Sequence, residues 1–484
     1  MAKRKHSSKR PQRVHKKQKK SQHDKRERLR RPNPRRRKTR AAKIPLTGAL
    51  QSAVATLSAV LDRRMAFRLT IIISGMLLAD GRRTASAWFV AGGVRDDWDR
   101  FYDCLVRIGW SSSRLAVAVL SLVVKQLAPG LGERVMMGID DSPTTRFGKK
   151  VEGAGVHHNP TPGPADGKWL YGHNWVCLAW LARHPLWGVI ALPLWSLMYV
   201  REVDVPKLAK KYGSWEFRTK HELGVCQMQW LTQVLKQLRL DVAVWLVVDG
   251  AYAARPFLLP ILQMGVTVVS RLRKDAGLYD LPPQGAHHNR IYGKHKISLV
   301  KRAGHRQGWK SITYDCRGEH VTRQYKTFLA TSKLISGQIR VVLLRYEDGS
   351  WAPYFCTDVS ASVEDILVAV GARWGIEEHF ASVKEIWGAG QQQVRNVMSN
   401  IGCWNLNGWL YTLVEICSWD QAKSDLVDRS DRSWDNAERR PSHADRRRKI
   451  AREMLRKPIL AALPAALNRT KFKSLLDHVI QLAA

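Results

Sequence analysis

The sequence predicts an α/β protein, with a mixed β-sheet flanked by helices, a helical domain before it and a strand-rich insertion within it. Three observations support this fold class. Residues 47–130 have the apolar spacing of helices, residues 131–274 alternate buried runs with helical segments, and short strand-like runs recur in 275–360. At 484 residues the chain is long enough for two or three domains.

The charge of the chain calls for a polyanionic partner. The sequence contains 80 Lys and Arg against 41 Asp and Glu, a formal net charge of +39, and is 45% hydrophobic. Nucleic acid and an anionic membrane surface both fit this balance. The longest apolar runs are shorter than the ~18 residues that span a bilayer, the basic N-terminus is not followed by a signal-type apolar segment, and seven scattered Cys indicate free thiols. We therefore predict a cytoplasmic protein that binds nucleic acid and no membrane.

Basic residues are concentrated at the N-terminus. Residues 1–44 hold 21 Lys and Arg and only two acidic residues, so 1–46 is expected to be a disordered arm that contacts phosphates without reading sequence. A solubilising tail is the alternative. Residues 47–130, punctuated by Gly81 and Gly92, are expected to form a helical domain that binds nucleic-acid ends or serves for packing and dimerisation.

Acidic residues follow two buried strands of the expected core. The apolar run 135–139 ends in Asp140 and Asp141, and the nearly continuous run 242–248 ends in Asp249. The expected order is three strands, helix, strand, helix, strand, over 135–139, 174–181, 188–195, 222–240, 242–248, 256–264 and 266–270. That order, with Asp after the first and fourth strands, is the layout of the RNase-H-like fold. An isolated Asp after a strand is more often a turn or helix-capping residue.

A helix starting at Arg373 is expected to separate apolar from charged side chains. At about 100° per residue, Arg373, Glu377 and Lys384 share one stripe. The adjacent apolar stripe contains Ile376, Phe380, Val383 and Trp387. Alone, the charged stripe equally fits a surface ion pair between residues four apart. Together with the strand-end Asp residues it supplies a third carboxylate, and two Mg²⁺ ions about 3.5 to 4 Å apart need several carboxylates for phosphodiester chemistry.

These residues resemble the DDE transposases of bacterial insertion sequences, in the group whose core is interrupted by a β-rich insertion. Asp141 followed by Ser matches the first Asp of the group, Asp249 matches the second, and the strand ending in Arg271 matches a phosphate-binding Arg. The helix signature of the group is Tyr, two residues, Arg, three residues, Glu, six residues, Lys. This chain has the Arg, Glu and Lys at 373, 377 and 384, with Val370 in place of the Tyr.

The resemblance implies a metal-dependent DNA transposase that cuts the ends of an insertion sequence and joins them to target DNA. It implies two Mg²⁺ ions, replaceable by Mn²⁺, double-stranded DNA with terminal inverted repeats as partner, a homodimer in the active complex, and a place at the bacterial nucleoid. The implied catalytic and metal-ligating residues are Asp141, Asp249 and Glu377, with Asp140 as the alternative first Asp. The implied DNA-binding residues are Arg271, Arg373, Trp374 and Lys384. Three other interpretations are an RNase-H-like nuclease without strand transfer, an inactive, DNA-binding transposase remnant, and a basic RNA-associated structural protein.

The 127 residues between Asp249 and Glu377 exceed what the core needs to connect its last strand to that helix. A β-rich insertion is therefore expected over 275–360, after the first part of the core at 131–274. The second part of the core is expected at 361–418, and a linker with C-terminal helices at 419–484. By resemblance, Trp309 or Trp351 of the insertion could stack on a base flipped from the cleaved end. With 19 Trp in the chain, each is more often a core residue.

Overall fold

A computed structural model describes most of the chain after the basic arm. The described residues are 45–46, 48–159, 167–285, 290–427, 434–436 and 438–462, with isolated positions at 472, 475–476 and 479–480. Residues 1–44 of the arm expected over 1–46 lie outside the described residues. The described residues from 45 onward belong to one compact unit.

Among the described residues, five helices precede the sheet, in the stretch where the sequence predicts a helical domain. They are α2 (Gly48–Ser58), α3 (Arg63–Leu78), α4 (Ala85–Ala91), α5 (Trp98–Trp110) and α6 (Ser112–Leu127). The side chains of Asp62 and Thr84 cap α3 and α4 by accepting backbone N–H groups of the first turn. Trp88 and Phe89 of α4 are fully buried, so this short helix is held by packing.

One helix in the described part of the chain, Ser112–Gly130, has the length and hydropathy to cross a membrane. Its side chains Leu115, Val119 and Val123 are fully buried, and the helix contacts α13 and β4. A buried helix in the core of a protein has the same apolar character.

Five strands form the core part of the sheet, in the order β4-β3-β1-β5-β6. Their bounds are β1 (Arg134–Thr145), β3 (Trp169–His184), β4 (Gly188–Tyr199), β5 (Ala243–Val248) and β6 (Thr267–Arg271). β3 is antiparallel to β1 and β4, whereas β5 and β6 run parallel to β1. The connecting helices are α7 (Val205–Tyr212), α8 (Lys220–Gln237) and α9 (Arg255–Gln263). This is the predicted RNase-H-like order, with β2 (Gly155–His158) added beside β3.

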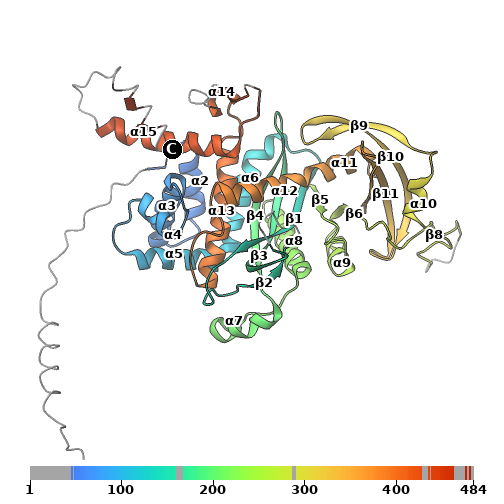
Figure 1. The fold of residues 1–484 in the computed structure, drawn as a ribbon, viewed down its shortest axis with the longest axis horizontal. Helices are drawn as coiled ribbons and strands as arrows, with labels where there is room; N and C mark the ends of the chain where they lie inside the picture. The colour runs from blue at the N-terminus through green and yellow to red at the C-terminus, as the bar shows by residue number, and fades with distance from the viewer. Residues whose placement is uncertain are drawn as a thin grey trace, which may run out of the picture. The chain divides into compact units, whose positions relative to one another are not determined.

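The insertion extends the same sheet. β12 (Trp351–Cys356) pairs antiparallel with β6, and β11 (Gly337–Arg345) and β10 (Glu319–Ser332) follow outward. β9 (Lys310–Cys316) and the short β7 (Leu278–Tyr279) both pair with β10. β7 also pairs with β8 (Lys296–Ile297). The result is one twelve-stranded sheet that runs from the core into the insertion (Figure 1). The strand-like runs expected over 275–360 are thus present as strands, and the same stretch also contains the short helix α10 (Leu299–Gly304).

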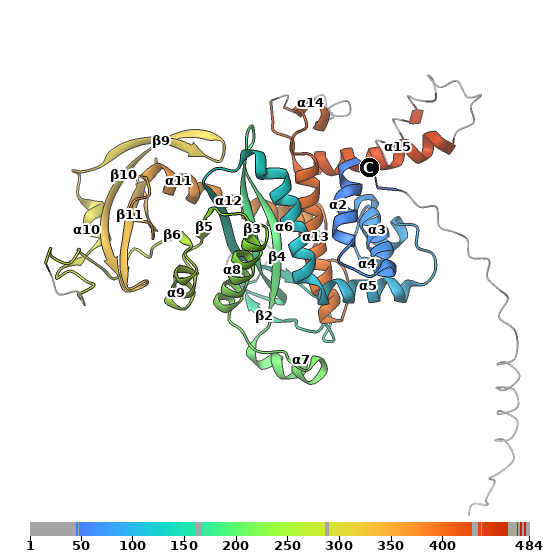
Figure 2. The ribbon, with the colours of Figure 1, turned by 180° about the vertical axis from the view of Figure 1, so that it is seen from behind.

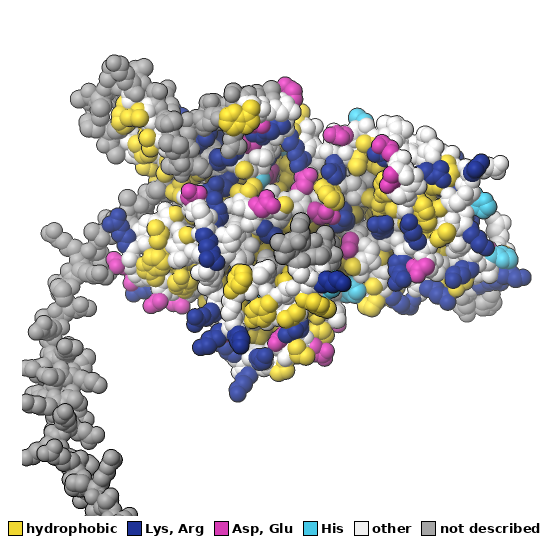
Figure 3. Space-filling model, viewed as in Figure 1, with side chains coloured by type: hydrophobic (Ala, Val, Ile, Leu, Met, Phe, Trp, Pro, Cys, Tyr) yellow, Lys and Arg dark blue, Asp and Glu magenta, His cyan; other side chains and the backbone are white. Residues whose placement is uncertain are grey.

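The remaining helices are α11 (Val363–Ala372), α12 (Trp374–Glu385), α13 (Val397–Cys417), α14 (Lys423–Leu426) and α15 (His443–Ala462). α13 is buried along almost its whole length and lies between the N-terminal helices and β4 (Figures 1 and 2). α15 continues through Pro458. Figure 3 shows Lys and Arg side chains over α7, whose exposed cations include Lys207, Lys210 and Lys211, and over the outer part of the insertion.

Candidate active site

Asp140 and Asp249 are brought together by the register of two parallel strands. Ile139 of β1 is paired with Val248 of β5, so the next position along each strand places the two Asp residues side by side at one edge of the sheet. The Oδ1 atom of Asp249 accepts hydrogen bonds from the backbone N–H groups of Ala251 (3.0 Å) and Tyr252 (3.3 Å). These two hydrogen bonds hold the Asp249 carboxylate in place through Oδ1, and neither of them involves Oδ2.

Asp140 and Asp141 point to opposite faces of the sheet, because side chains alternate along a strand. Gly138 lies against α12, where a Cβ atom would be 2.3 Å from Cδ1 of Ile376. Asp140, two residues on, shares this face. Ile139 instead approaches α8, with its Cδ1 atom 3.7 Å from a Cβ placed on Gly224. Asp141 therefore lies on the α8 side.

Arg373 connects the first strand to the third carboxylate. Its Nη1 atom lies 3.0 Å from Oδ2 of Asp140, and its Nη2 atom lies 2.7 Å from Oε1 of Glu377. The expected stripe on α12 is thus present, with Ile376, Phe380 and Val383 buried beside it. The Arg373 guanidinium is shared between two carboxylates of the predicted site and does not form only a surface pair.

The carboxylate edge holds more negative charge than its neighbours compensate. Burial, followed by the nearby charge of Asp249, raises the pKa of Asp140 to about 7, although Arg373 and the N–H of Asp141 act in the opposite direction. An additional cation beside this carboxyl group would stabilise its ionised form. Closely placed carboxylates that repel one another are typical of catalytic sites.

The donor set fits a hard divalent cation in chemistry. Mg²⁺ prefers carboxylate oxygens and usually binds through one or two carboxylates plus substrate phosphates. Among the residues that the structure describes, however, no group of three His, Cys, Asp or Glu is gathered as a complete metal site. Arg373 lies between Asp140 and Glu377 and already binds an oxygen of each, so a cation would compete with the guanidinium for these atoms.

Two side chains near the site were missed in the sequence. Lys220, the first residue of α8, places its Nζ atom 2.6 Å from Oδ2 of Asp141, and the buried Tyr252 hydroxyl lies 3.4 Å from Oδ1. Burial raises the pKa of Tyr252 well above its usual value, and the charges of Asp141, Asp140 and Asp249 add to the effect. The available signal for Tyr252 was its place three residues after Asp249.

Arg271 and Lys384 differ in their surroundings. Arg271 is exposed at the end of β6, and its Cβ atom lies 3.9 Å from a Cβ placed on Gly250, next to Asp249. Lys384 lies two turns beyond Glu377 on α12, and burial lowers its pKa. Its side chain forms no hydrogen bond or ion pair with any residue in the described part of the chain.

The three Trp residues of the predicted DNA contacts have cations over their rings. Arg317, in the turn between β9 and β10, lies 4.9 Å from the ring centroid of Trp374, and Lys274 lies 4.6 Å from that of Trp351. The ring of Trp309 contacts both Arg345 (4.0 Å) and Lys326 (4.8 Å). These contacts occupy ring surface that a stacked base would need, so base stacking by Trp309 or Trp351 stays a prediction.

The C-terminal segment contacts α12 and the residue Trp387 that follows it. Arg440 forms an ion pair with Glu378, the residue after Glu377. Trp387, just beyond α12, donates to Nε2 of His443 (2.8 Å), and Nδ1 of His443 donates to Glu415 (2.5 Å).

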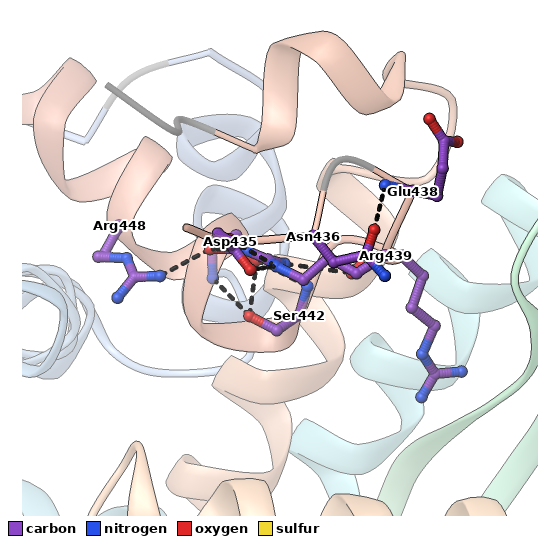
Figure 4. A network of polar contacts seen from close by, with 8 residues as sticks. Asp435, Asn436, Glu438, Arg439, Ser442 and Arg448 are labelled. Atoms are coloured by element: carbon purple, nitrogen blue, oxygen red, sulfur yellow. Dashed lines mark hydrogen bonds and ion pairs between the residues drawn. The ribbon is translucent and has the colours of Figure 1, made fainter. Parts of the chain in front are cut away.

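A second polar network fixes the start of α15. It joins Arg439 to Asp435 and Asp445, and Asp445 to Ser442 and Arg448 (Figure 4). Arg447 of the same helix donates to the backbone oxygens of Leu77 and Ala79 at the end of α3. The C-terminal segment therefore links the helix bearing Glu377 to the N-terminal helices.

Comparison with known proteins finds a family model that is similar to part of this chain. Residues 228–404 match the family model of the transposase DDE domain. The matched segment contains Asp249, Arg271, Arg373, Glu377 and Lys384, and it begins after β1. No curated protein matches the chain.

Proposed function

We propose that this protein is a DNA transposase of the cut-and-paste type, because residues 228–404 match the family model of the transposase DDE domain. In this proposal it cleaves both ends of an insertion sequence and joins the released 3′-hydroxyl groups to target DNA. A homodimer would hold the two ends, and the protein would act at the nucleoid in the bacterial cytoplasm. The observation that supports it best is the Arg373 guanidinium shared by Asp140 and Glu377 beside Asp249.

We propose Asp140, Asp249 and Glu377 as the residues that would hold two Mg²⁺ ions, or Mn²⁺ in their place. The sequence favoured Asp141 as the first of the three. Asp140 is preferred now because it shares the face of α12, senses the charge of Asp249 and contacts Arg373. Asp141 is paired with Lys220 on the other face and remains the alternative. When bound, the metal ions would supply Lewis-acid stabilisation of the phosphate and a water of lowered pKa.

The chain's own cations would position the DNA. Arg271 and Lys384 are free of ion pairs to described residues, and a charge-assisted contact to phosphate contributes roughly 1.5 to 3 kcal/mol. Arg373 would turn from its carboxylates to a phosphate when another cation neutralises Asp140. Lys220 and Tyr252 would hold Asp141 in place, and the Tyr252 hydroxyl is a candidate for the phenol that the family has at the position of Val370.

The test is cleavage and joining of DNA that contains the gene with its native flanks. With Mg²⁺ and a target plasmid, the full-length protein should produce fragments cut at both ends of the element, then products joined to the target. Omission of the metal and the Asp249→Asn variant are the controls. Cut ends without joined products would favour the nuclease alternative. Binding without any cut would favour the inactive remnant.

A further inference from the structure

A basic pocket lies beyond the carboxylate edge, where β1 and α12 both end. It has a volume of about 930 Å³ and is lined by the end of β1, the turn after it, α12 and the loop that follows α12. Among its described lining residues six are basic and none is acidic: Arg82, Arg146, Lys149, Lys150, Lys384 and Arg395. Apart from Arg146, none of these cations forms a hydrogen bond or ion pair with another described side chain. The pocket therefore has an uncompensated positive charge.

The walls of the pocket are fixed by a buried arginine. Arg146 Nε donates to Nδ1 of His173 (3.1 Å), and its Nη1 atom donates to the backbone oxygen of Gly390 (2.6 Å). Gly390 has φ = 101°, and a Cβ there would lie 3.3 Å from Cβ of Thr144, so the loop after α12 packs closely on the end of β1. The pocket is thus a built feature of two elements that also bear Asp140 and Glu377.

Phe147 stands out among the lining residues because 81% of its surface is exposed. It follows the anchored Arg146 directly and precedes Lys149 and Lys150 in the same turn. A single exposed apolar side chain is common on protein surfaces. An exposed ring surrounded by unpaired cations is the combination that single-stranded nucleic acid uses, with bases stacked on the ring and phosphates on the cations.

The position of the pocket relates it to the cut strand. Lys384 is seven residues beyond Glu377, roughly 10 Å along the helix axis. Pro143 and Thr144 lie two to four residues beyond Asp140 and Asp141 on β1. A strand that leaves the carboxylate edge in this direction enters the pocket after a few nucleotides. A volume of 930 Å³ falls in the range of small-ligand pockets, which suits a few nucleotides and not the width of a duplex.

We propose that this pocket binds an unpaired segment of one DNA strand next to the cleavage site, with a base stacked on Phe147 and phosphates held by Lys149, Lys150, Lys384 and Arg395. The proposal rests on the proposed function for the identity of the strand. In this proposal the base stacks on Phe147, whose ring has no cation over it among the described residues. The rings of Trp309 and Trp351 each have a cation over them.

Binding is measured by fluorescence anisotropy with full-length protein, without divalent metal, on a labelled single-stranded oligodeoxynucleotide and on its duplex. Phe147→Ala should weaken single-strand binding about fivefold or more, leave duplex binding unchanged and keep the salt dependence, because stacking is not a charge interaction. Phe147→Trp should restore affinity. Equal loss for single strand and duplex, or no loss for either, would overturn the proposal.

The cations are tested by the salt dependence of the same binding. Each neutralised phosphate of a single strand contributes a slope of about −0.7 in log K against log salt, so Lys149→Ala with Lys150→Ala should make the slope less steep by up to about 1.4. Lys210→Ala with Lys236→Ala is the matched control, since both lysines are exposed and lie on α7 and α8 outside the pocket. The same slope change in the control pair would contradict the proposal.

A crosslink locates the strand independently of the basic arm. A single strand containing 5-bromouracil, irradiated on the full-length protein, should attach to the peptide that contains Phe147, as found by mass spectrometry. Crosslinks confined to residues 1–44 would overturn the proposal. Asp249→Asn should retain this crosslink. Absence of the crosslink in wild-type protein would refute binding in the pocket. Absence of metal-dependent cleavage by wild-type protein, with the crosslink present, would refute the transposase mechanism.

Discussion

Glu415 on α13 is 2% exposed, yet its pKa is lowered, whereas Asp140 at the end of β1 is less buried and has a pKa raised to about 7. Burial by itself raises both values. At Glu415 the charge of Arg446 and the hydrogen bond from His443 outweigh burial. At Asp140 the neighbouring Asp249 adds to burial, and Arg373 is shared with Glu377.

The difference shows which cluster has its charge balanced by the protein's own side chains. The Glu415 cluster contains its own counter-charges and ties α13 to α15, so its role is structural. The Asp140 edge keeps excess negative charge at the surface end of two strands, as a site that accepts cations does. Depth of burial therefore does not distinguish a catalytic carboxylate from a structural one, but charge compensation does.

The largest expected effect is the loss of cleavage activity when a carboxylate near Asp140 is replaced. Asp249→Asn or Glu377→Gln should lower the cleavage rate by about a thousandfold or more, because the stabilisation lost with a metal ligand amounts to several kcal/mol. The melting temperature should stay within a few degrees of wild type, and DNA binding within a few-fold. Cleavage is followed on gels and Tm by calorimetry. Near-normal cleavage by either variant would refute the assigned site.

Glu415→Gln should give the opposite result. It leaves Arg446 buried without its counter-charge, so the free energy of unfolding should fall by about 3 to 5 kcal/mol. Denaturant unfolding measures the change, and Glu438→Gln serves as control because that side chain is 89% exposed in its ion pair with Lys423. Equal stability of the two variants would mean that the cluster is not a structural one.

Replacement of Asp140 should change how the stability of the protein depends on pH. An Asp whose pKa is raised on folding binds its proton more tightly in the folded state, so its contribution to stability is lost as pH rises from about 4 to about 7. Metal-free wild type should therefore lose more stability across this range than Asp140→Asn, which should be as stable or more stable at pH 8 although inactive. Parallel stability curves would remove the electrostatic argument for Asp140.

The same variant decides between the two neighbouring Asp residues. Asp140→Asn should abolish cleavage, and Asp141→Asn should be milder, because Asp141 faces Lys220 and not Glu377. Cleavage rates of the two variants, compared at saturating Mg²⁺, test this ranking. If Asp141→Asn is the inactive one, the first metal ligand is the residue that the sequence favoured.

The smallest effect is expected at the edge of the structural cluster. Arg440→Ala removes the ion pair with Glu378, where both side chains are at least 40% exposed, so stability should change by no more than about 1 kcal/mol. Activity should change little if Arg440 only supports packing. A loss of cleavage at unchanged Tm would show that this contact positions the neighbouring Glu377.

The sequence by itself determined the α/β class, the strand order, the β-rich insertion and the stripe of Arg373, Glu377 and Lys384. These follow from local periodicity and spacing, since an apolar run or a helical face is defined by residues close together in the chain. The family resemblance also rested on such short-range spacing, and the matched segment confirms it.

Only the tertiary structure decided which charges meet. The alternation of β1 separates Asp140 from Asp141, but the face covered by α12 depends on how that helix, more than 230 residues later, packs on the sheet. The approach of Lys220 and Tyr252 to Asp141, and of the loop after α12 to the turn bearing Phe147, depends equally on contacts between distant segments. Sequence spacing does not contain these distances, because they are set when side chains pack into one core.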